Sequence, residues 1–192
     1  MISGLPSKSM NKIYYSGIGS RETPEKVLIA MTGIATFAWM NGLILRSGGA
    51  EGADSAFELG VFDDRDKEIY LPWKGYNNNK STNFETSKED FDIASIYHPR
   101  WNKLSTAAKN LHARNVQIIM GRSNNTILSK FVVCWTKDGA FSRKTRTKET
   151  GGTGLAIALA DAQGIPIFNL YYEQSYRRIY ETIEGIRDER LS

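Results

Sequence analysis

Short apolar runs alternate along this chain with longer segments in which apolar residues recur every three or four positions. The short runs are typical of buried strands, and the longer segments are typical of helices that pack one face against a core. Strands are predicted at residues 12–19, 43–49, 67–73, 130–136 and 165–171. Helices are predicted at residues 23–42, 53–62, 104–121, 154–164 and 176–191.

This alternation predicts an α/β fold. Because crossovers between parallel strands are right-handed, we expect a Rossmann-like, doubly wound, mostly parallel sheet of about five strands with helices on both faces. Residues 74–129 interrupt this alternation of strands and helices and begin with a polar, turn-rich stretch. They are expected to form an insertion or elaborated crossover between the third and fourth strands. Residues 1–11 are expected to be a flexible tail, and residues 12–192 a single domain.

Local signals mark several helix ends. Thr23 is expected to cap the helix at residues 23–42, with Pro24 at its first position, because a hydroxyl accepts from free amides and proline needs no amide partner there. Gly42 and Gly121 are expected to end two helices.

Composition excludes several classes of protein. A chain of 192 residues with 41% hydrophobic content can bury the core of one domain. No stretch approaches the roughly 18 apolar residues of a membrane span, and the start lacks a secretion signal, so a soluble cytoplasmic protein is expected. The single cysteine, Cys134, excludes an internal disulfide and a cysteine metal cluster, and is expected to be buried. A net charge of +4 is by itself weak evidence for nucleic-acid binding.

Three glycine-rich segments follow predicted strands: GIGSRETP at 17–24, SGGAEGAD at 47–54 and TGGTG at 150–154. Ligands of open parallel sheets bind outside the carboxyl ends of strands, and a strand order of 3-2-1-4-5 would bring these loops to one crevice. Glycine lets backbone amides approach an anion, so phosphate is the expected ligand. Dinucleotide and Walker patterns are absent from the sequence, so no cofactor is expected.

The carboxylates beside the second glycine loop leave two interpretations open. Asp54 and Glu58 are predicted to share a face near the start of a helix, and Glu51 lies in the loop. Acidic residues at a helix N-terminus are favoured by the helix dipole without any ligand. Alternatively, a carboxylate in a phosphate-lined crevice contacts a ribose hydroxyl or attacks an anomeric carbon, which makes Glu51 and Glu58 weak catalytic candidates.

Basic and aromatic residues suggest further contacts with nucleic acid. The loop at residues 143–148 carries Arg143, Lys144, Arg146 and Lys148 without an acidic residue, which fits either a solvated loop or an anion site. Trp73 and Trp101 lie beside basic residues, as suits stacking of unpaired bases, although packing of the insertion explains them equally well. Arg114 lies among apolar residues of a predicted helix, where an unpaired charge is costly, so a phosphate or an acidic side chain should meet it. His112 is expected to face the pocket or to orient Arg114.

As an ordered set, GIGSRETP, LILRSGGAEGADSAF, LHARNVQIIMG and GGTGLAIALADAQGIPIF resemble the DNA-processing protein A (DprA/Smf) family of the SLOG superfamily. KEIYLPWKGYN, HPRW and VVCWTKDG look most like the stand-alone DprA-like proteins of bacteriophages. The likeness spans about residues 13 to 171. It implies a Rossmann-like domain that binds single-stranded DNA in DNA processing or recombination, in the cytoplasm of a host cell. We also expect a homo-oligomer.

From the glycine loops and the resemblance together, one set of residues is expected to bind the ligand phosphate. These residues are Gly17, Gly19, Ser20, Arg21, Ser47, Gly48, Gly49, Ala50, Gly52, Asp54, Arg114, Asn115, Gly151, Gly152, Thr153 and Gly154.

The chain also departs from the family pattern. Glu58 stands where the family usually has histidine, and Val116 replaces the second arginine of its RNR motif. Two further functions therefore remain open. One is a binder or sponge of a small nucleotide signal, ADP-ribose-like or cyclic, in phage counter-defence. The other is a nucleotide N-glycoside hydrolase, although Ile157 stands where related hydrolases carry their catalytic glutamate.

Overall fold

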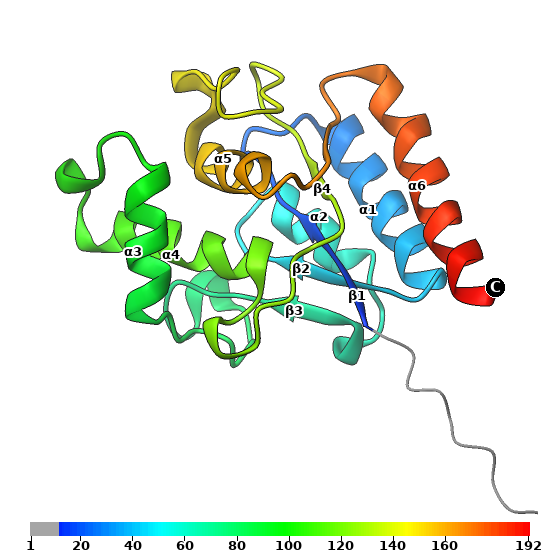
Figure 1. Ribbon diagram of the computed structural model, residues 1–192, viewed down its shortest axis with the longest axis horizontal. Coiled ribbons are helices and arrows are strands. Elements are labelled where there is room, and N and C mark those ends of the chain that lie inside the picture. The colour runs from blue at the N-terminus through cyan, green and yellow to red at the C-terminus, as the bar shows by residue number, and fades with distance from the viewer. Residues whose placement is uncertain (1–11) are drawn as a thin grey trace, which may run out of the picture.

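A five-stranded parallel sheet forms the centre of the computed structural model, which describes residues 12–192 (Figure 1). The strands are β1 (Ile13–Gly17), β2 (Leu43–Ser47), β3 (Lys67–Ile69), β4 (Val132–Cys134) and β5 (Ile167–Asn169). Their order in the sheet is β3-β2-β1-β4-β5, and every pair is parallel. The predicted doubly wound α/β fold is confirmed, and the strand order is the one that would bring the glycine loops to one crevice. The predicted tail at 1–11 lies outside the described residues.

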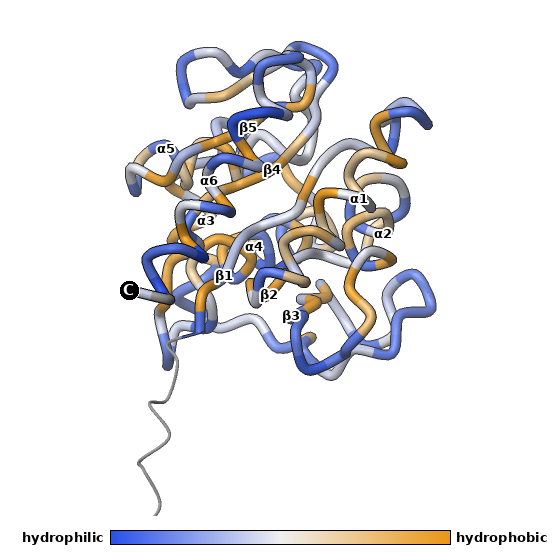
Figure 2. Tube along the Cα trace, turned by 90° about the vertical axis from the view of Figure 1, so that its right-hand side faces the viewer, coloured by the Kyte–Doolittle hydropathy of each residue, from blue (hydrophilic) through white to orange (hydrophobic). Residues whose placement is uncertain are grey.

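Helices cover both faces of the sheet (Figures 1 and 2). The helices α1 (Glu25–Met40), α2 (Ala53–Leu59) and α6 (Glu173–Leu191) pack on one face. The helices α4 (Thr106–Met120) and α5 (Gly154–Ala162) pack on the other, and α3 (Lys88–Tyr97) packs against α4. Each layer encloses its own apolar cluster, and Cys134 lies fully buried in the second. Within residues 12–192, no helix has the length and apolar character needed to cross a membrane.

Some predicted boundaries were wrong. Thr23 does not cap α1, because its hydroxyl donates to the carbonyl of Ser20 and Pro24 precedes the first helical residue. The helix α3 falls partly in the segment predicted to be turn-rich. Its start is fixed by a reciprocal capping box between Ser87 and Asp90. The sequence contains this helix-start signal, because Ser87 is followed three residues later by the acidic Asp90.

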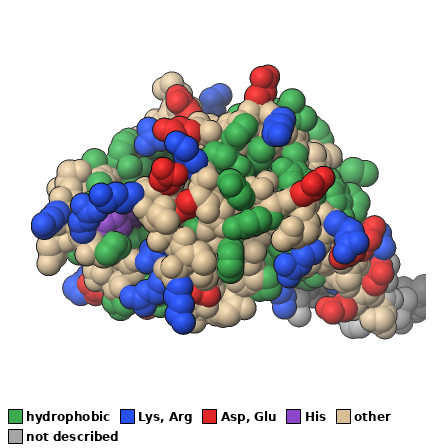
Figure 3. Space-filling model, turned by 90° about the horizontal axis from the view of Figure 1, so that it is seen from above, with side chains coloured by type: hydrophobic (Ala, Val, Ile, Leu, Met, Phe, Trp, Pro, Cys, Tyr) green, Lys and Arg blue, Asp and Glu red, His purple; other side chains and the backbone are tan. Residues whose placement is uncertain are grey.

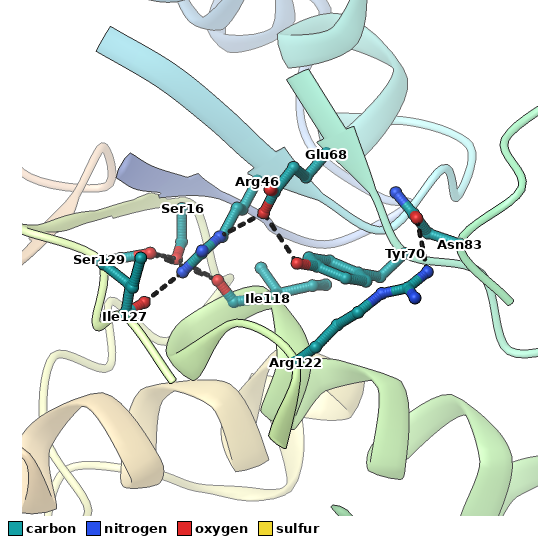
Figure 4. A network of polar contacts seen from close by, with 9 residues as sticks. All are labelled: Ser16, Arg46, Glu68, Tyr70, Asn83, Ile118, Arg122, Ile127 and Ser129. Carbon is teal, nitrogen blue, oxygen red and sulfur yellow. Dashed lines mark hydrogen bonds and ion pairs between the residues drawn. The ribbon is translucent and has the colours of Figure 1, made fainter. Parts of the chain in front are cut away.

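A polar row crosses the sheet beneath α4 (Figure 4). Ser16, Arg46 and Glu68 are register partners on three neighbouring strands. Arg46 is only 2% exposed, and its Nε lies 2.8 Å from the Glu68 carboxylate. The guanidinium carbon also lies 3.8 Å from the centre of the Tyr14 ring. A buried guanidinium is stable here because it is paired and also lies over an aromatic face.

The same row fixes the C-terminal end of α4 and the segment that follows it. The Ser16 hydroxyl donates to the carbonyl of Ile118 at 2.9 Å, and Arg46 donates to the carbonyl of Ile127. Glu68 also accepts from the Tyr70 hydroxyl at 2.7 Å. A helix seated on the sheet in this way presents its more N-terminal residues at the carboxyl edge of the strands.

We predict that Glu68→Gln lowers the free energy of unfolding by about 2 to 3 kcal/mol, because it leaves the buried Arg46 guanidinium without its counter-charge. Urea unfolding measures the change. Asp64→Asn is the matched control, since its carboxylate is 93% exposed and pairs with Lys67 at the surface. Equal effects of the two substitutions would show that Arg46 does not depend on Glu68.

Candidate functional site

Loops from three separate parts of the sequence meet at the carboxyl edge of the sheet. The Ser47 hydroxyl donates to the carbonyl of Gly17 at 2.7 Å, which joins the first two glycine-rich segments. Asn115 of α4 donates to the carbonyl of Gly152 at 3.3 Å, which joins the third segment to α4. The amide of Ser20 donates to the carbonyl of Trp135 at 3.3 Å. The gathering of these loops, predicted from strand order, is therefore present.

The loops and α4 enclose a cavity of about 290 Å³, called here the Arg114 pocket. The loops after β1, β2, β3 and β4 and the helices α2, α4 and α5 contribute to its walls. Its lining residues are Ile18, Gly19, Ser20, Arg21, Glu22, Ala50, Asp54, Tyr76, Ala108, Leu111, His112, Arg114, Asn115, Thr150, Gly151, Gly152, Thr153 and Ala156.

Arg114 is the buried charge of this pocket. Its side chain is 6% exposed, and its nearest carboxylate oxygen, on Asp54, lies 3.4 Å from Nη1. Charge-assisted hydrogen bonds are usually about 2.7–2.9 Å long, so this pair is loose. The Nε atom of Arg114 is buried and has no hydrogen-bond partner among the described residues. The guanidinium therefore retains unused donors in a pocket that is open to a ligand.

Gly48 makes room for Arg114. A Cβ atom at position 48 would lie 1.2 Å from Nη1 of Arg114 and 2.6 Å from the Asp54 carboxylate. Any side chain at this position would displace the guanidinium. Gly48 was predicted to expose its backbone to phosphate. In the structure, its missing side chain leaves the space that the Arg114 guanidinium occupies.

Asp54 is fully enclosed at the start of α2 and is 4% exposed. Burial raises the pKa of this carboxyl group, and Arg114 acts against that shift. The amide of Ala50 donates to Asp54 at 3.4 Å. Asp54 therefore orients Arg114 without holding it in close contact.

Two histidine rings lie where the pocket opens. The ring centres of His98 and His112 are 4.5 Å apart, and His112 Nδ1 is buried without a hydrogen-bond partner. Burial, together with His98 and Arg114, lowers the pKa of His112 to about 4. His112 is therefore neutral near pH 7, and it lines the pocket as expected.

A carboxylate inside the loop after β4 shapes the wall that carries Thr150 and Gly151. Asp138 accepts from the hydroxyls of Thr147, at 2.7 Å, and Thr150, and from the Thr147 amide at 3.1 Å. Burial alone would raise the pKa of Asp138, but these hydrogen bonds outweigh it and lower the pKa to about 2. The loop is thereby folded back toward α4.

The structure brings most of the predicted phosphate-binding residues together. Those that line the Arg114 pocket are Gly19, Ser20, Arg21, Ala50, Asp54, Arg114, Asn115, Gly151, Gly152 and Thr153. Those that do not line it are Gly17, Ser47, Gly48, Gly49, Gly52 and Gly154. Several of the second group serve packing instead: a Cβ at Gly17 would meet the Phe57 ring at 2.5 Å, and one at Gly52 would meet the backbone of Arg21 at 2.9 Å.

The acidic candidates are separated. Asp54 lines the Arg114 pocket, whereas Glu58 lines a different cavity of about 620 Å³ and accepts from Asn79 at 2.9 Å. The predicted shared face of Asp54 and Glu58 therefore does not produce a shared site. Glu51 is exposed and lines neither cavity. Neither glutamate lines the Arg114 pocket.

The basic and aromatic residues predicted to contact nucleic acid also lie in different places. Arg143, Arg146 and Lys148 line a groove of about 750 Å³ beside the pocket, whereas Lys144 does not. Trp101 packs against Phe91 and under the Lys109 ammonium, and Trp73 packs edge-on against Tyr76. Both tryptophans thus have packing partners, and Trp73 is still 40% exposed. Tyr76, Leu111 and Thr150 also line the pocket, and they were not among the residues predicted to do so. For Leu111, the helical spacing of α4 indicates the inward face of the helix but not which cavity that face meets.

We predict that Gly48→Ala displaces Arg114 and lowers the free energy of unfolding by about 1 to 3 kcal/mol, the range for overpacked sites. Thermal or urea unfolding measures the loss. The matched control is Gly152→Ala, because a Cβ there meets no atom within 4 Å. Wild-type stability in Gly48→Ala would contradict the observed packing.

Within the described residues, no group of three or more histidine, cysteine, aspartate or glutamate side chains is arranged to hold a metal ion. No family model matches the chain, and no curated protein or solved structure matches it either. Its chemistry must therefore be inferred from the pocket itself, in which a buried, loosely paired arginine is bordered by glycine loops and by His112.

Proposed function

We propose that this protein binds nucleotide phosphate in the Arg114 pocket and that its ligand is single-stranded DNA. One observation carries the proposal: Arg114 is buried with an unpartnered Nε and a carboxylate no closer than 3.4 Å. Burying a charge without close partners is costly, and a phosphate oxygen would supply the missing acceptor. Arginine also matches phosphate geometrically, through paired donors.

The surrounding residues support a phosphate in preference to a carboxylate ligand. Ser20, Thr153 and the glycines at positions 151 and 152 line the pocket and offer hydroxyl and amide donors around the guanidinium. Phosphate has more acceptor oxygens than a carboxylate and is the common guest of such glycine-rich loops. The resemblance to DprA-like phage proteins favours DNA processing or recombination in the host cytoplasm as the setting.

A second candidate, the capture of a small nucleotide signal, is favoured by the size of the pocket. Its volume of about 290 Å³ is near the lower end of the range for small-molecule sites. A mononucleotide, cyclic nucleotide or ADP-ribose-like ligand would satisfy Arg114 as well as DNA does. The two candidates differ in their dependence on salt, because only a polyanion releases many counterions when it binds.

We predict that Arg114→Gln weakens the binding of thymidine monophosphate and of an oligothymidylate by about 10- to 100-fold, the equivalent of losing roughly 1.5 to 3 kcal/mol from one charged hydrogen-bonding group. Calorimetry at low and high salt measures both affinities. Arg177→Gln on α6 is the control, since that side chain is 83% exposed and far along the chain from the pocket.

The salt dependence separates the candidates. Oligothymidylate affinity that falls steeply with salt supports single-stranded DNA, and tight binding of the mononucleotide with little salt dependence supports the small signal. Binding of neither ligand, or equal binding by wild type and Arg114→Gln, would overturn the assignment of the pocket.

A further inference from the structure

A basic groove adjoins the Arg114 pocket. It lies between the turn that follows α3 and the loop that follows β4, and has a volume of about 750 Å³. Five basic residues line it, with no aspartate or glutamate among the fifteen lining residues: Arg100, Lys103, Arg143, Arg146 and Lys148. In Figure 3, lysine and arginine side chains gather around a histidine surface at the left, on the side of α3 and α4.

The Asp161 carboxylate lies beside these charges and offsets them only in part: it accepts from the backbone amide of Arg143 at 2.8 Å and acts against the lowering of the pKa of Arg146. None of the five forms an ion pair with a carboxylate of residues 12–192. Arg146 instead donates to the backbone carbonyls of Gly154, at 2.8 Å, and Tyr97, at 3.3 Å. Burial and the neighbouring Arg143 lower the pKa of Arg146, and burial with Arg146 and Arg100 lowers the pKa of His98. Positive charge is therefore concentrated along the lining of the groove.

The groove and the pocket share a boundary formed by two glycines and by the side chains of His112 and Thr150. His112, Thr150, Gly151 and Gly152 line both cavities. A Cβ atom built at Gly151 or Gly152 would meet no atom within 4 Å. Gly151 also has a φ of +59°, which favours glycine at this position. The boundary is therefore open at Gly151 and Gly152, between the pocket and the groove.

We propose that the groove and the Arg114 pocket form one continuous track for a single strand of nucleic acid: one phosphate is anchored by Arg114, and the neighbouring phosphates cross Gly151–Gly152 into the groove. This inference rests on the proposed function and extends it. It gives the five basic residues of the groove a role in binding. A mononucleotide in the pocket brings a single phosphate, which leaves these groove residues without a ligand phosphate. The ligand is therefore an oligonucleotide, and its affinity depends on length.

The charge pattern also favours a nucleic-acid strand over an acidic protein segment. A strand carries a phosphate at every nucleotide, so it meets both the buried guanidinium and the groove cations with the same chemical group. An acidic peptide would match the exposed cations, but its carboxylates offer fewer acceptors to the donor-rich pocket. Competition by polyglutamate distinguishes the two.

The test is a length series. Binding of oligothymidylates of about 2 to 16 nucleotides, spanning the site sizes of comparable single-strand grooves, is measured by fluorescence anisotropy for the wild type and for Arg100→Glu/Lys148→Glu. Both residues are exposed, so the double variant should fold. Wild-type affinity should rise at least tenfold with length and then level off. The double variant should lose that gain and retain mononucleotide affinity, with a salt slope lower by about 1.4, or 0.7 per lost contact.

The matched control is Lys26→Glu/Arg177→Glu, which makes the same change in net charge at exposed positions on α1 and α6. It should keep most of the length gain. Absence of a length gain in the wild type, its survival in Arg100→Glu/Lys148→Glu, or equally tight binding of polyglutamate would overturn the inference while mononucleotide binding through Arg114 stands. Loss of all binding, including that of the mononucleotide, would instead overturn the proposed function and the track with it.

Discussion

The buried guanidinium of Arg114 is the constraint around which this end of the molecule is arranged. It lies against the bare backbone of Gly48, at 3.4 Å from a carboxylate that is itself enclosed, and its Nε has no partner among residues 12–192. A buried pair with poor geometry stabilises a fold little, because desolvation offsets the attraction. The unpartnered donor of Arg114, beside a cavity, is the feature on which the proposal of an anionic ligand rests.

A second buried arginine holds the helix that carries the first. Arg46, with Ser16 and Glu68, fixes the C-terminal end of α4 over the sheet, and the side chains of the preceding turns then reach the carboxyl edge of the strands (Figure 4). The two arginines differ in their surroundings: Arg46 has a carboxylate at 2.8 Å, whereas Arg114 has none that close. Arg46 is paired closely within the fold, whereas Arg114 is paired loosely and lies at a cavity.

The position of the glycine loops was predictable, because each follows a predicted strand and ligands of doubly wound sheets bind outside the carboxyl ends of strands. The strand order itself was not, since more than one order is common in such folds. The roles of single glycines were not, since Gly48 and Gly17 serve side chains that come from elsewhere in the chain. The helix α3 was missed although its capping box was legible at Ser87. The groove could not be predicted, because it forms only when the turn after α3 faces the loop after β4.

The most direct measurement is the ¹H–¹⁵N resonance of the Arg114 Nε–H group, assigned by its loss in Arg114→Gln. On titration with thymidine monophosphate, and then with an oligothymidylate, the account predicts that this resonance shifts and that its exchange with solvent slows, as a phosphate pairs with the guanidinium. Binding of either ligand that leaves the Arg114 resonance unchanged would contradict the central claim that this buried charge is the anchor of the site.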